Sequence, residues 1–375
     1  MNPGPIVSDG AVLVYRLFDV ADAVDLSVAE QILATGAAPL ERLRLEGAQS
    51  AIGVELSRPP LEVALGPRDV PLASGARAAM ASARLFDYGV VSVLYRIPIA
   101  PGTALSALVP LAEELFVEPT PALDAAARGE ALGLCASLAP ALEREHAWDG
   151  LESYQVFLVR SLEGGPWTAE GLLEAAPIPE LLLGETSETP LSAAERADVL
   201  SVRQSYLVDD LAVVHWNSAL VWERSGVEDI PDLLELATAQ LLELRFYDAE
   251  LDRELHAIYD EIEHGGSPVA NVFTRRYRTL QRRTAALLLE LSEMIERLEN
   301  AVKIVGDFHL ARVYQAAVRR FRLPAWQETV LRKQRMLAEV NDLIGDAADT
   351  SRSELMELAV IVLIAVEIVA ALGGH

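Results

Sequence analysis

The hydrophobic and polar positions of this chain change their rhythm past its middle. In the first half, apolar residues alternate with polar ones or form short runs rich in β-branched and aromatic residues, and prolines separate these runs. Shorter helical patterns lie between them. Strands are expected at 11–18, 51–56, 61–65, 88–99 and 152–159, with a last pair within 206–221, and helices at 26–34, 103–115 and 122–142.

From Glu228 onward the apolar positions follow a heptad, which is the period of helices that pack along a continuous seam. A Gly-Gly-Ser-Pro break at 265–268 separates two runs, so we expect a helical hairpin about 45 Å long. A weaker third run follows at 326–344. The first run is Leu234, Ala237, Leu241, Leu244, Leu251, Leu255, Ile258 and Ile262, and the second is Leu280, Thr284, Leu287, Leu291, Met294, Leu298, Ala301 and Val305.

The final pattern, at 355–372, is almost wholly aliphatic but contains the acids Glu357 and Glu367. As a helix it would span about 27 Å, slightly less than the roughly 30 Å of a hydrocarbon core. A carboxylate near the centre of a membrane helix costs about 3 kcal/mol, which removes most of the gain from the aliphatic residues. Two interpretations follow: a membrane-associated helix, or a helix buried in a helical assembly. The positions that would make either contact are Leu358, Val362, Ile364, Glu357 and Glu367.

These patterns predict an α+β protein with three parts. An N-terminal α/β domain at 1–227 precedes an all-α domain at 228–350 with long antiparallel coiled-coil helices, and a hydrophobic C-terminal helix occupies 351–375. At 375 residues the chain is long enough for two domains, each with its own core.

Composition narrows the class of partner and the compartment. The formal net charge of −25 argues against a general nucleic-acid binder, so no DNA partner is expected. The single cysteine, Cys135, cannot form an intrachain disulfide and fits a core position in an Ala/Leu-rich helix. Because the N-terminus lacks a charged and an apolar signal region, the bulk of the protein is expected in the cytoplasm, associated with the inner membrane through its C-terminus.

Charge is segregated along the helical half. The first long helix is rich in acids, whereas the second opens with five arginines between 275 and 283. Ion pairing across the hairpin is one interpretation, and contact with anionic lipid headgroups or an RNA backbone is the other. A second basic set has fewer acids nearby and is the better candidate for contact with phosphate or lipid. Its members are Arg319, Arg320, Arg322, Arg332, Lys333 and Arg335.

The sequence contains no established catalytic signature. It lacks phosphate-binding glycine loops, zinc-protease motifs and nucleophile-elbow motifs, and its six histidines have no metal-ligand spacing. The adjacent acids Asp209 and Asp210 fit a solvated turn. His215, with Trp216 and Asn217, is the most site-like cluster, although a strand histidine usually has a structural role. We therefore predict no catalytic residue, no metal and no cofactor.

Several blocks give the chain a resemblance to the required-for-meiotic-nuclear-division family, also called domain of unknown function 155. They occur in family order, cover roughly 85–372 and include the acid inside the aliphatic tail. The blocks are 87–91 (DYGVV), 211–222 (LAVVHWNSALVW), 241–251 (LLELRFYDAEL), 307–314 (DFHLARVY), 324–328 (PAWQE) and 355–368 (LMELAVIVLIAVEI).

The resemblance implies an α/β domain, a domain of long helices and a membrane-associated C-terminal helix. Eukaryotic members include mitochondrial inner-membrane proteins that support mitochondrial translation, so contact with RNA or the ribosome is implied by family analogy only. This chain lacks an Arg/Ser-rich targeting segment and resembles a bacterial-type member.

Three hypotheses about function follow. The first is a non-enzymatic, membrane-associated scaffold that self-associates through its helices. The second is a soluble homo-oligomer with its C-terminal helix buried in a bundle. The third is an enzyme or ligand-binding α/β domain that uses the His215 region.

Overall fold

The computed structural model divides into two compact units. The first comprises Met1–Phe246 and Arg297–Ala325, and the second Tyr247–Glu296 and Trp326–His375. The chain therefore passes between the units three times: inside α7 (Asp229–His264), inside α9 (Arg275–Asn300) and between Ala325 and Trp326. The residues described by the structure are 4–35, 39–45, 54–56, 58–116, 120–187, 189–264, 275–300, 302–304 and 308–342.

The first unit is built on a ten-stranded sheet around the long strand β1 (Ile6–Asp19). β10 (Glu152–Glu163) and β7 (Val90–Pro98) pair with β1 on its two sides, both antiparallel. Among the described pairings of this sheet, β10 with β13 (Ser218–Trp222) is parallel and the others are antiparallel. The order is β11-β12-β13-β10-β1-β7-β6-β5-β3, with β8 also paired to β1. The remaining strands are β3 (Leu40–Arg42), β5 (Leu61–Val70), β6 (Arg77–Leu85), β8 (Thr103–Ala104), β11 (Arg203–Gln204) and β12 (Leu211–Val214).

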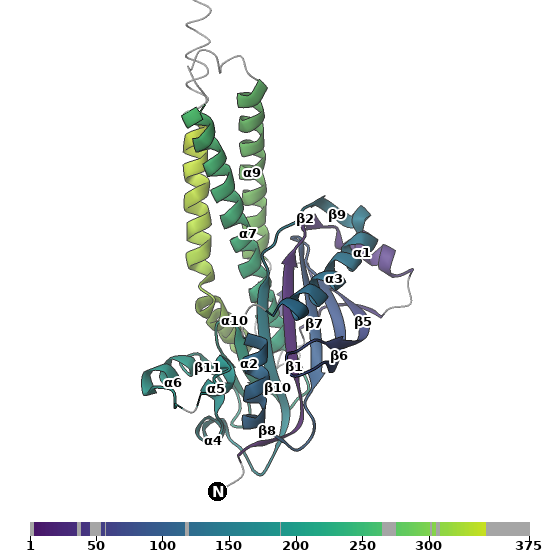
Figure 1. The fold of residues 1–375 in the computed structure, drawn as a ribbon, viewed down its shortest axis with the longest axis vertical. Coiled ribbons are helices and arrows are strands. Elements are labelled where there is room, and N and C mark those ends of the chain that lie inside the picture. Colours follow the sequence, from purple (N-terminus) through teal and green to yellow (C-terminus); the bar gives the residue numbers. More distant parts are fainter. Residues whose placement is uncertain are drawn as a thin grey trace, which may run out of the picture. The chain divides into compact units, whose positions relative to one another are not determined.

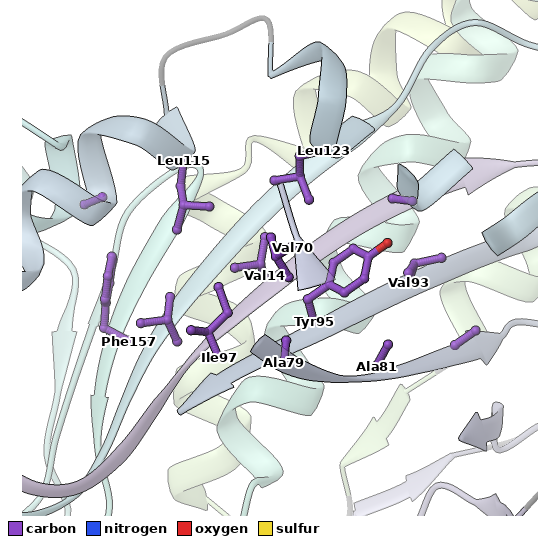
Figure 2. Close-up of a cluster of buried hydrophobic side chains, with 14 of the residues drawn as sticks. Val14, Val70, Ala79, Ala81, Val93, Tyr95, Ile97, Leu115, Leu123 and Phe157 are labelled. Atoms are coloured by element: carbon purple, nitrogen blue, oxygen red, sulfur yellow. The ribbon is translucent and has the colours of Figure 1, made fainter. Parts of the chain in front are cut away.

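Alternation along the strands gives the sheet two different faces. One face carries Val12, Val14 and Phe18 of β1 into a core that also contains Leu115 and Leu123 from helices (Figure 2). The helices of this core come from sequence with Ala and Leu at helical spacing, and Thr120–Pro121 begins the longest of them with proline in the first turn. They are α1 (Leu26–Leu33), α2 (Val109–Phe116) and α3 (Pro121–Ser137).

The opposite face carries Leu13, Tyr15 and Leu17, each at most 1% exposed. The first half of α7 lies against this face, because side chains of β6, β7 and β10 bond to its N-terminal turns. Two small ribbons, β2–β9 and β4–β14, and several short helices complete the unit (Figure 1). Their bounds are β2 (Ala21–Val24), β4 (Val54–Leu56), β9 (Leu142–Glu145), β14 (Val302–Ile304), α4 (Ala169–Ala175), α5 (Ile178–Leu183), α6 (Ala193–Val199), α10 (Phe308–Arg320) and the 3-10 turns η1 (Leu105–Leu108) and η2 (Ala139–Ala141).

The turn between β6 and β7 shows why one position must be glycine. Gly89 has a φ of +92°, and a Cβ atom there would lie 1.6 Å from the carbonyl oxygen of Ala21. No L side chain fits this close approach of two backbone segments. The turn falls in the 87–91 block on which the family resemblance partly rests.

In the described residues, the second unit consists of helices: the second half of α7, α9 (Arg275–Asn300) as far as Glu296, and helical residues 326–342 (Figure 1). Predicted seam positions are buried on each segment, including Leu251, Ile258, Leu291 and Leu337. Polar contacts also join the segments. Lys333 bonds to Asp248 and Asp252 of α7 at 2.6 and 2.7 Å, and Gln334 donates to Ser292 of α9 at 3.2 Å.

The structure confirms an α+β protein with a sheet-rich N-terminal region and a helical C-terminal region. Most of the expected strands and helices occur, but strand β6, the short strands β2, β3, β9, β11 and β14, and helices α4 to α6 were not expected. The second heptad run was expected to continue as helix to Val305, but residues 302–304 form β14, which pairs with β4. The segment expected to be helical at 103–115 begins instead with a short strand and a 3-10 turn, because β8 pairs with β1. The predicted domain limits stay a prediction.

The predicted hydrophobic helix at 351–375 lies outside the described residues. Among the residues that the structure does describe, none of the helices is both long enough and apolar enough to cross a membrane.

Candidate functional site: charged contacts between the sheet and helix α7

The start of α7 carries acids on the side that faces the sheet. Glu228, Asp232 and Glu235 follow one another at spacings of four and three residues, which places them on one helical face. The neighbouring Leu233, Leu234 and Ala237 are fully buried, so the acids enter an interior rather than a solvated surface. Acids in the first turn of a helix are also stabilised by the positive end of the helix dipole.

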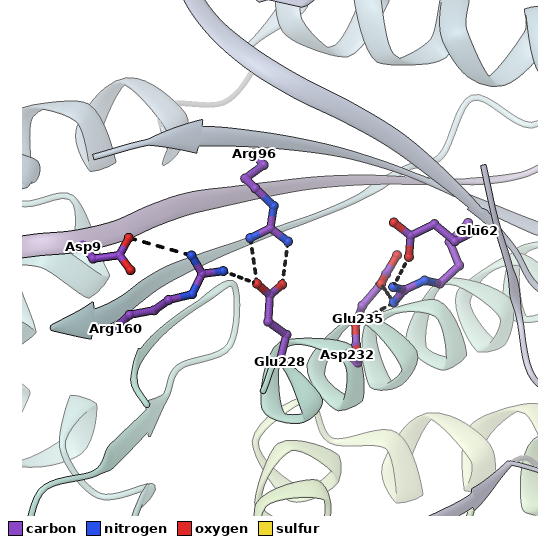
Figure 3. Close-up of polar contacts among 8 residues, drawn as sticks. Asp9, Glu62, Arg96, Arg160, Glu228, Asp232 and Glu235 are labelled. Carbon is purple, nitrogen blue, oxygen red and sulfur yellow. Dashed lines mark hydrogen bonds and ion pairs between the residues drawn. The ribbon is translucent and has the colours of Figure 1, made fainter. Parts of the chain in front are cut away.

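Arg84 of β6 is the centre of one ionic cluster. Its guanidinium donates to Glu62 at 2.6 Å, to Asp232 at 2.9 Å and to Glu235 (Figure 3). The Arg84 and Glu235 side chains are 9% and 1% exposed. Burial raises the pKa of Glu235 to about 7, despite the opposing effect of Arg84, and burial likewise raises the pKa of Asp232. Burial is thus the main cause of the raised pKa of Glu235, and the neighbouring acids Asp232 and Glu62 add to it.

Glu228 is the centre of a second cluster, one turn earlier. Arg96 of β7 binds both of its carboxylate oxygens, at 2.9 and 2.5 Å, and Arg160 of β10 donates to one of them at 2.6 Å (Figure 3). Asp9 lies 3.8 Å from Arg160. Burial opposes ionisation of Glu228, but the two guanidinium groups outweigh burial and lower its pKa. In this cluster two arginines surround one acid, whereas in the Arg84 cluster three acids surround one arginine.

A third cluster involves the only histidine that faces two carboxylates in the described chain. His146 Nε2 lies 2.7 Å from Asp19, which ends β1, and Nδ1 lies 3.3 Å from Asp22 of β2. The imidazole also stacks on Phe246 of α7, with ring centroids 4.5 Å apart. Burial alone would lower the pKa of His146, but the hydrogen bonds to Asp19 and Asp22 raise it to about 9. Burial raises the pKa of Asp19 to about 6.

These three clusters hold α7 to three parts of the sheet region. Removing one partner of a buried ion pair costs about 3–5 kcal/mol, because the other charge is left without compensation. Within the described residues, no group of three or more His, Cys, Asp or Glu side chains is arranged to hold a metal ion. The geometry is that of a structural attachment.

The predicted basic set divides between the two units. Arg319, Arg320 and Arg322 belong to the first, and Arg332, Lys333 and Arg335 to the second. Arg320 pairs with Asp198 at 2.8 Å, and Lys333 is held by two acids. The other four are exposed and form no ion pair in the part of the chain that is described.

The His215 cluster is mostly buried. His215 is 4% exposed, and its Nδ1 lies 3.5 Å from the Asn217 side chain, while Trp216 is 61% exposed. Burial and then Arg320 lower the pKa of His215 to about 4, which keeps the ring neutral at physiological pH. Of the adjacent acids, Asp209 pairs with Arg224, whereas Asp210 accepts from two backbone amides of its own turn.

The other predicted residues have the following places. Cys135 is buried, as expected, and burial raises its pKa to about 11. Across the predicted hairpin, Arg283 lies 3.0 Å from Glu254, in agreement with ion pairing there. The tail positions Leu358, Val362, Ile364, Glu357 and Glu367 lie outside the described residues.

The sequence interpretation missed the three ionic clusters altogether. A signal for two of them was present, because acids at heptad spacing among buried leucines of one helix indicate partners on the surface that the helix covers. Those arginine partners lie 68 to 151 residues away in sequence, on strands β6, β7 and β10. No local pattern connects positions so far apart.

Comparison with known proteins gives one family and one relative. The family model described as "Uncharacterized protein MJ0711, N-terminal domain" matches residues 9–229. The chain is also similar to "Uncharacterized protein MJ0711" of Methanocaldococcus jannaschii, with 23% identity over 188 residues. This alignment covers 47% of the chain and 53% of the relative, so the chain spans about half of that protein's length. No solved structure matches the chain.

Proposed function

We propose a function on the premise that this chain belongs to the family of the MJ0711 N-terminal domain, whose match at 9–229 spans more than half of it. We infer that the protein is a non-enzymatic scaffold. In it, the helix α7 is one of the chain segments that link an α+β unit to a helical unit. The sequence blocks described above support a finer assignment to the required-for-meiotic-nuclear-division group.

The observation that carries this proposal is the construction of α7. The helix has 36 residues, and the unit boundary lies between Phe246 and Tyr247. Its first half is attached to the sheet through buried ionic clusters, and its second half supplies seam positions to the helical unit. A scaffold requires a folded attachment and a separate surface for assembly, and these two halves provide both.

Self-association through the helical unit is supported by apolar side chains on its outer surface. Tyr259 of α7, Leu289 of α9 and Met336 are 55%, 63% and 42% exposed. Large apolar residues on the solvent side of seam-forming helices favour contact with further helices. These residues make the helical unit the proposed site of contact between copies of the chain.

The variant Leu289→Glu tests this contact. We expect it to lower the mass measured by size-exclusion chromatography with light scattering. The matched control is Leu132→Glu, because Leu132 of α3 is similarly exposed, at 55%, but belongs to the first unit. Equal masses for the wild type and both variants would contradict assembly through this surface.

Membrane association is the second part of the proposal. Its support is the aliphatic run at 355–372, in which Glu367 would require a partner group or a proton inside a hydrocarbon core. Fractionation of the full-length protein tests it against the alternative of a soluble homo-oligomer. We expect the protein in the membrane fraction and its release by detergent. A supernatant protein that aggregates when truncated after Thr350 would favour the buried-helix alternative.

A further inference from the structure

The solvent-facing side of α10 carries an aromatic residue and a line of arginines. Phe308, Arg312 and Arg319 lie within about 40° of one another around the helix, and Arg322 follows just beyond its end. Phe308 is 84% exposed, and the three arginines are exposed as well. The other side of the helix is buried, with Leu310, Val313, Ala316 and Ala317 at most 3% exposed. One side therefore belongs to the core, and the other is open.

The exposed arginines on this side form no ion pairs with the acids that the structure describes. Arg320, their neighbour on the buried side, pairs with Asp198, but Arg312, Arg319 and Arg322 form no ion pair within the described residues. Arg322 is exposed and has a left-handed backbone, with a φ of +58°. Within the described residues, the surface along α10 and just beyond its end therefore carries three arginines without ion-pair partners, in a chain with 56 acids and 31 basic residues.

An apolar loop adjoins the start of the same helix. The ring of Tyr206 lies 5.4 Å from His309, the residue that follows Phe308. The next two residues, Leu207 and Val208, are 58% and 72% exposed. The loop is not loose, because Asp210 accepts hydrogen bonds from the backbone amides of Tyr206 and Leu207 at 2.7 and 2.8 Å. The fold therefore exposes two aliphatic side chains in a loop whose Tyr206 contacts the residue after Phe308.

We propose that Phe308, Leu207 and Val208, together with Arg312, Arg319 and Arg322, form a docking surface for a bilayer that contains anionic phospholipids. The guanidinium groups bind headgroup phosphates, and the apolar side chains enter the boundary with the acyl chains. Leu207 and Val208 favour lipid over nucleic acid, because aliphatic side chains cannot stack on bases as aromatic ones do. The net charge of −25 does not prevent this contact, since physiological salt screens exposed charges beyond about 8 Å.

This inference rests on the membrane association proposed above and deepens it. A C-terminal segment alone gives one point of attachment, whereas a second surface on the α+β unit would place that unit at the headgroups. The two attachments are separable by experiment, because the arginine variant retains the whole tail.

Binding of the full-length protein to vesicles tests the proposal. The variant carries Arg312→Gln, Arg319→Gln and Arg322→Gln, and the vesicles contain phosphatidylcholine with or without phosphatidylglycerol. An arginine near an anionic surface contributes about 1 kcal/mol, or about fivefold in partitioning, so we expect about a hundredfold loss on the anionic vesicles. The control carries Arg44→Gln, Arg77→Gln and Arg282→Gln, which are exposed and without described ion pairs. We expect it to bind like the wild type.

A second variant tests the apolar part. Phe308→Ser with Val208→Ser should reduce the binding that persists at high salt, and Leu132→Ser, which alters an exposed leucine elsewhere, should not. Equal binding by the arginine variant and its control would overturn the proposal, even if the tail still attached all the proteins to vesicles. Loss of binding to single-stranded RNA without loss of vesicle binding would assign the surface to nucleic acid and overturn it as well.

Discussion

The two halves of α7 are stabilised in different ways. In the first unit, the helix presents the partly buried Asp232 and the buried Glu235 to Arg84 of the sheet. In the second unit, it presents Leu251, Leu255 and Ile258 to other helices, and polar contacts lie beside this seam. The first arrangement depends on particular partners, and the second on apolar volume.

The two halves of α7 therefore differ in how much stability a substitution removes. A buried charge left without its partner is costly, whereas an apolar seam loses stability in proportion to the volume removed. Ion clusters of this kind also favour one register, because a helix shifted by one residue would separate each acid from its arginine. We infer that the first half specifies position and the second half supplies a surface for assembly.

The largest effect is expected from Arg84→Met. The variant leaves the buried Glu235 and the partly exposed Glu62 and Asp232 without their cation, so we expect a loss of about 4 kcal/mol in the free energy of unfolding. Denaturant titration measures it. Arg77→Met on the same strand is the control, because Arg77 is exposed and should change stability by less than about 0.5 kcal/mol. Equal losses for the two variants would show that the cluster contributes nothing.

A smaller effect is expected in the helical unit from Leu291→Ala. Leu291 is fully buried, and truncation of a buried leucine costs about 3 kcal/mol through lost transfer energy and the cavity that remains. Thermal unfolding followed by circular dichroism measures the change. Leu289→Ala, two residues earlier and 63% exposed, should have almost no effect. If both variants melted alike, the seam would not be the interior of this unit.

The contribution of His146 to the stability of the first unit depends on pH. Its folded-state pKa of about 9 lies above the unfolded value of about 6.5, so its contribution is complete below pH 6.5 and is lost as the pH rises through 9. We expect His146→Gln to lose about 2 kcal/mol at pH 6 and little at pH 10. Unfolding measured across this range checks the prediction, and a constant difference would contradict the assigned ion pairs.

The smallest effect is expected from Glu228→Gln. Its folded-state pKa is lowered, so its stabilisation is present above the unfolded pKa and is lost as the pH falls through the folded value. We expect a loss of about 1.5 kcal/mol at pH 7, since charge-assisted hydrogen bonds to Arg96 and Arg160 are weakened. At acidic pH the variant and the wild type should converge. A difference that grows on acidification would reverse the assigned sign.

Features that depend on a local repeat could be predicted from the sequence. The heptad positions Leu251, Leu255 and Leu291 were predicted and are buried, because a seam repeats locally and its period is visible in one segment. Strand β1 was predicted for a similar reason, since its alternation places Leu13 and Val14 on opposite faces.

Other features depend on contacts between distant segments. Strand β6 reads RAAMASARL and has weak β propensity, so its strand conformation comes from pairing with β5 and β7. The partners of Glu228 and Glu235 could not be predicted, because the arginines lie on strands far away in sequence. The exposed side of α10 was only half predicted. Arg319 and Arg322 were in the basic set, but Phe308 and Arg312 were not.

Hydrogen exchange along α7, compared between the wild type and Arg84→Met, tests the central claim most directly. That claim is that buried ionic clusters hold the first half of the helix and that an apolar seam holds the second. We predict that the variant loses amide protection at 232–246 while 250–258 keeps most of its protection. A uniform loss along the helix, or an unchanged first half, would contradict the claim.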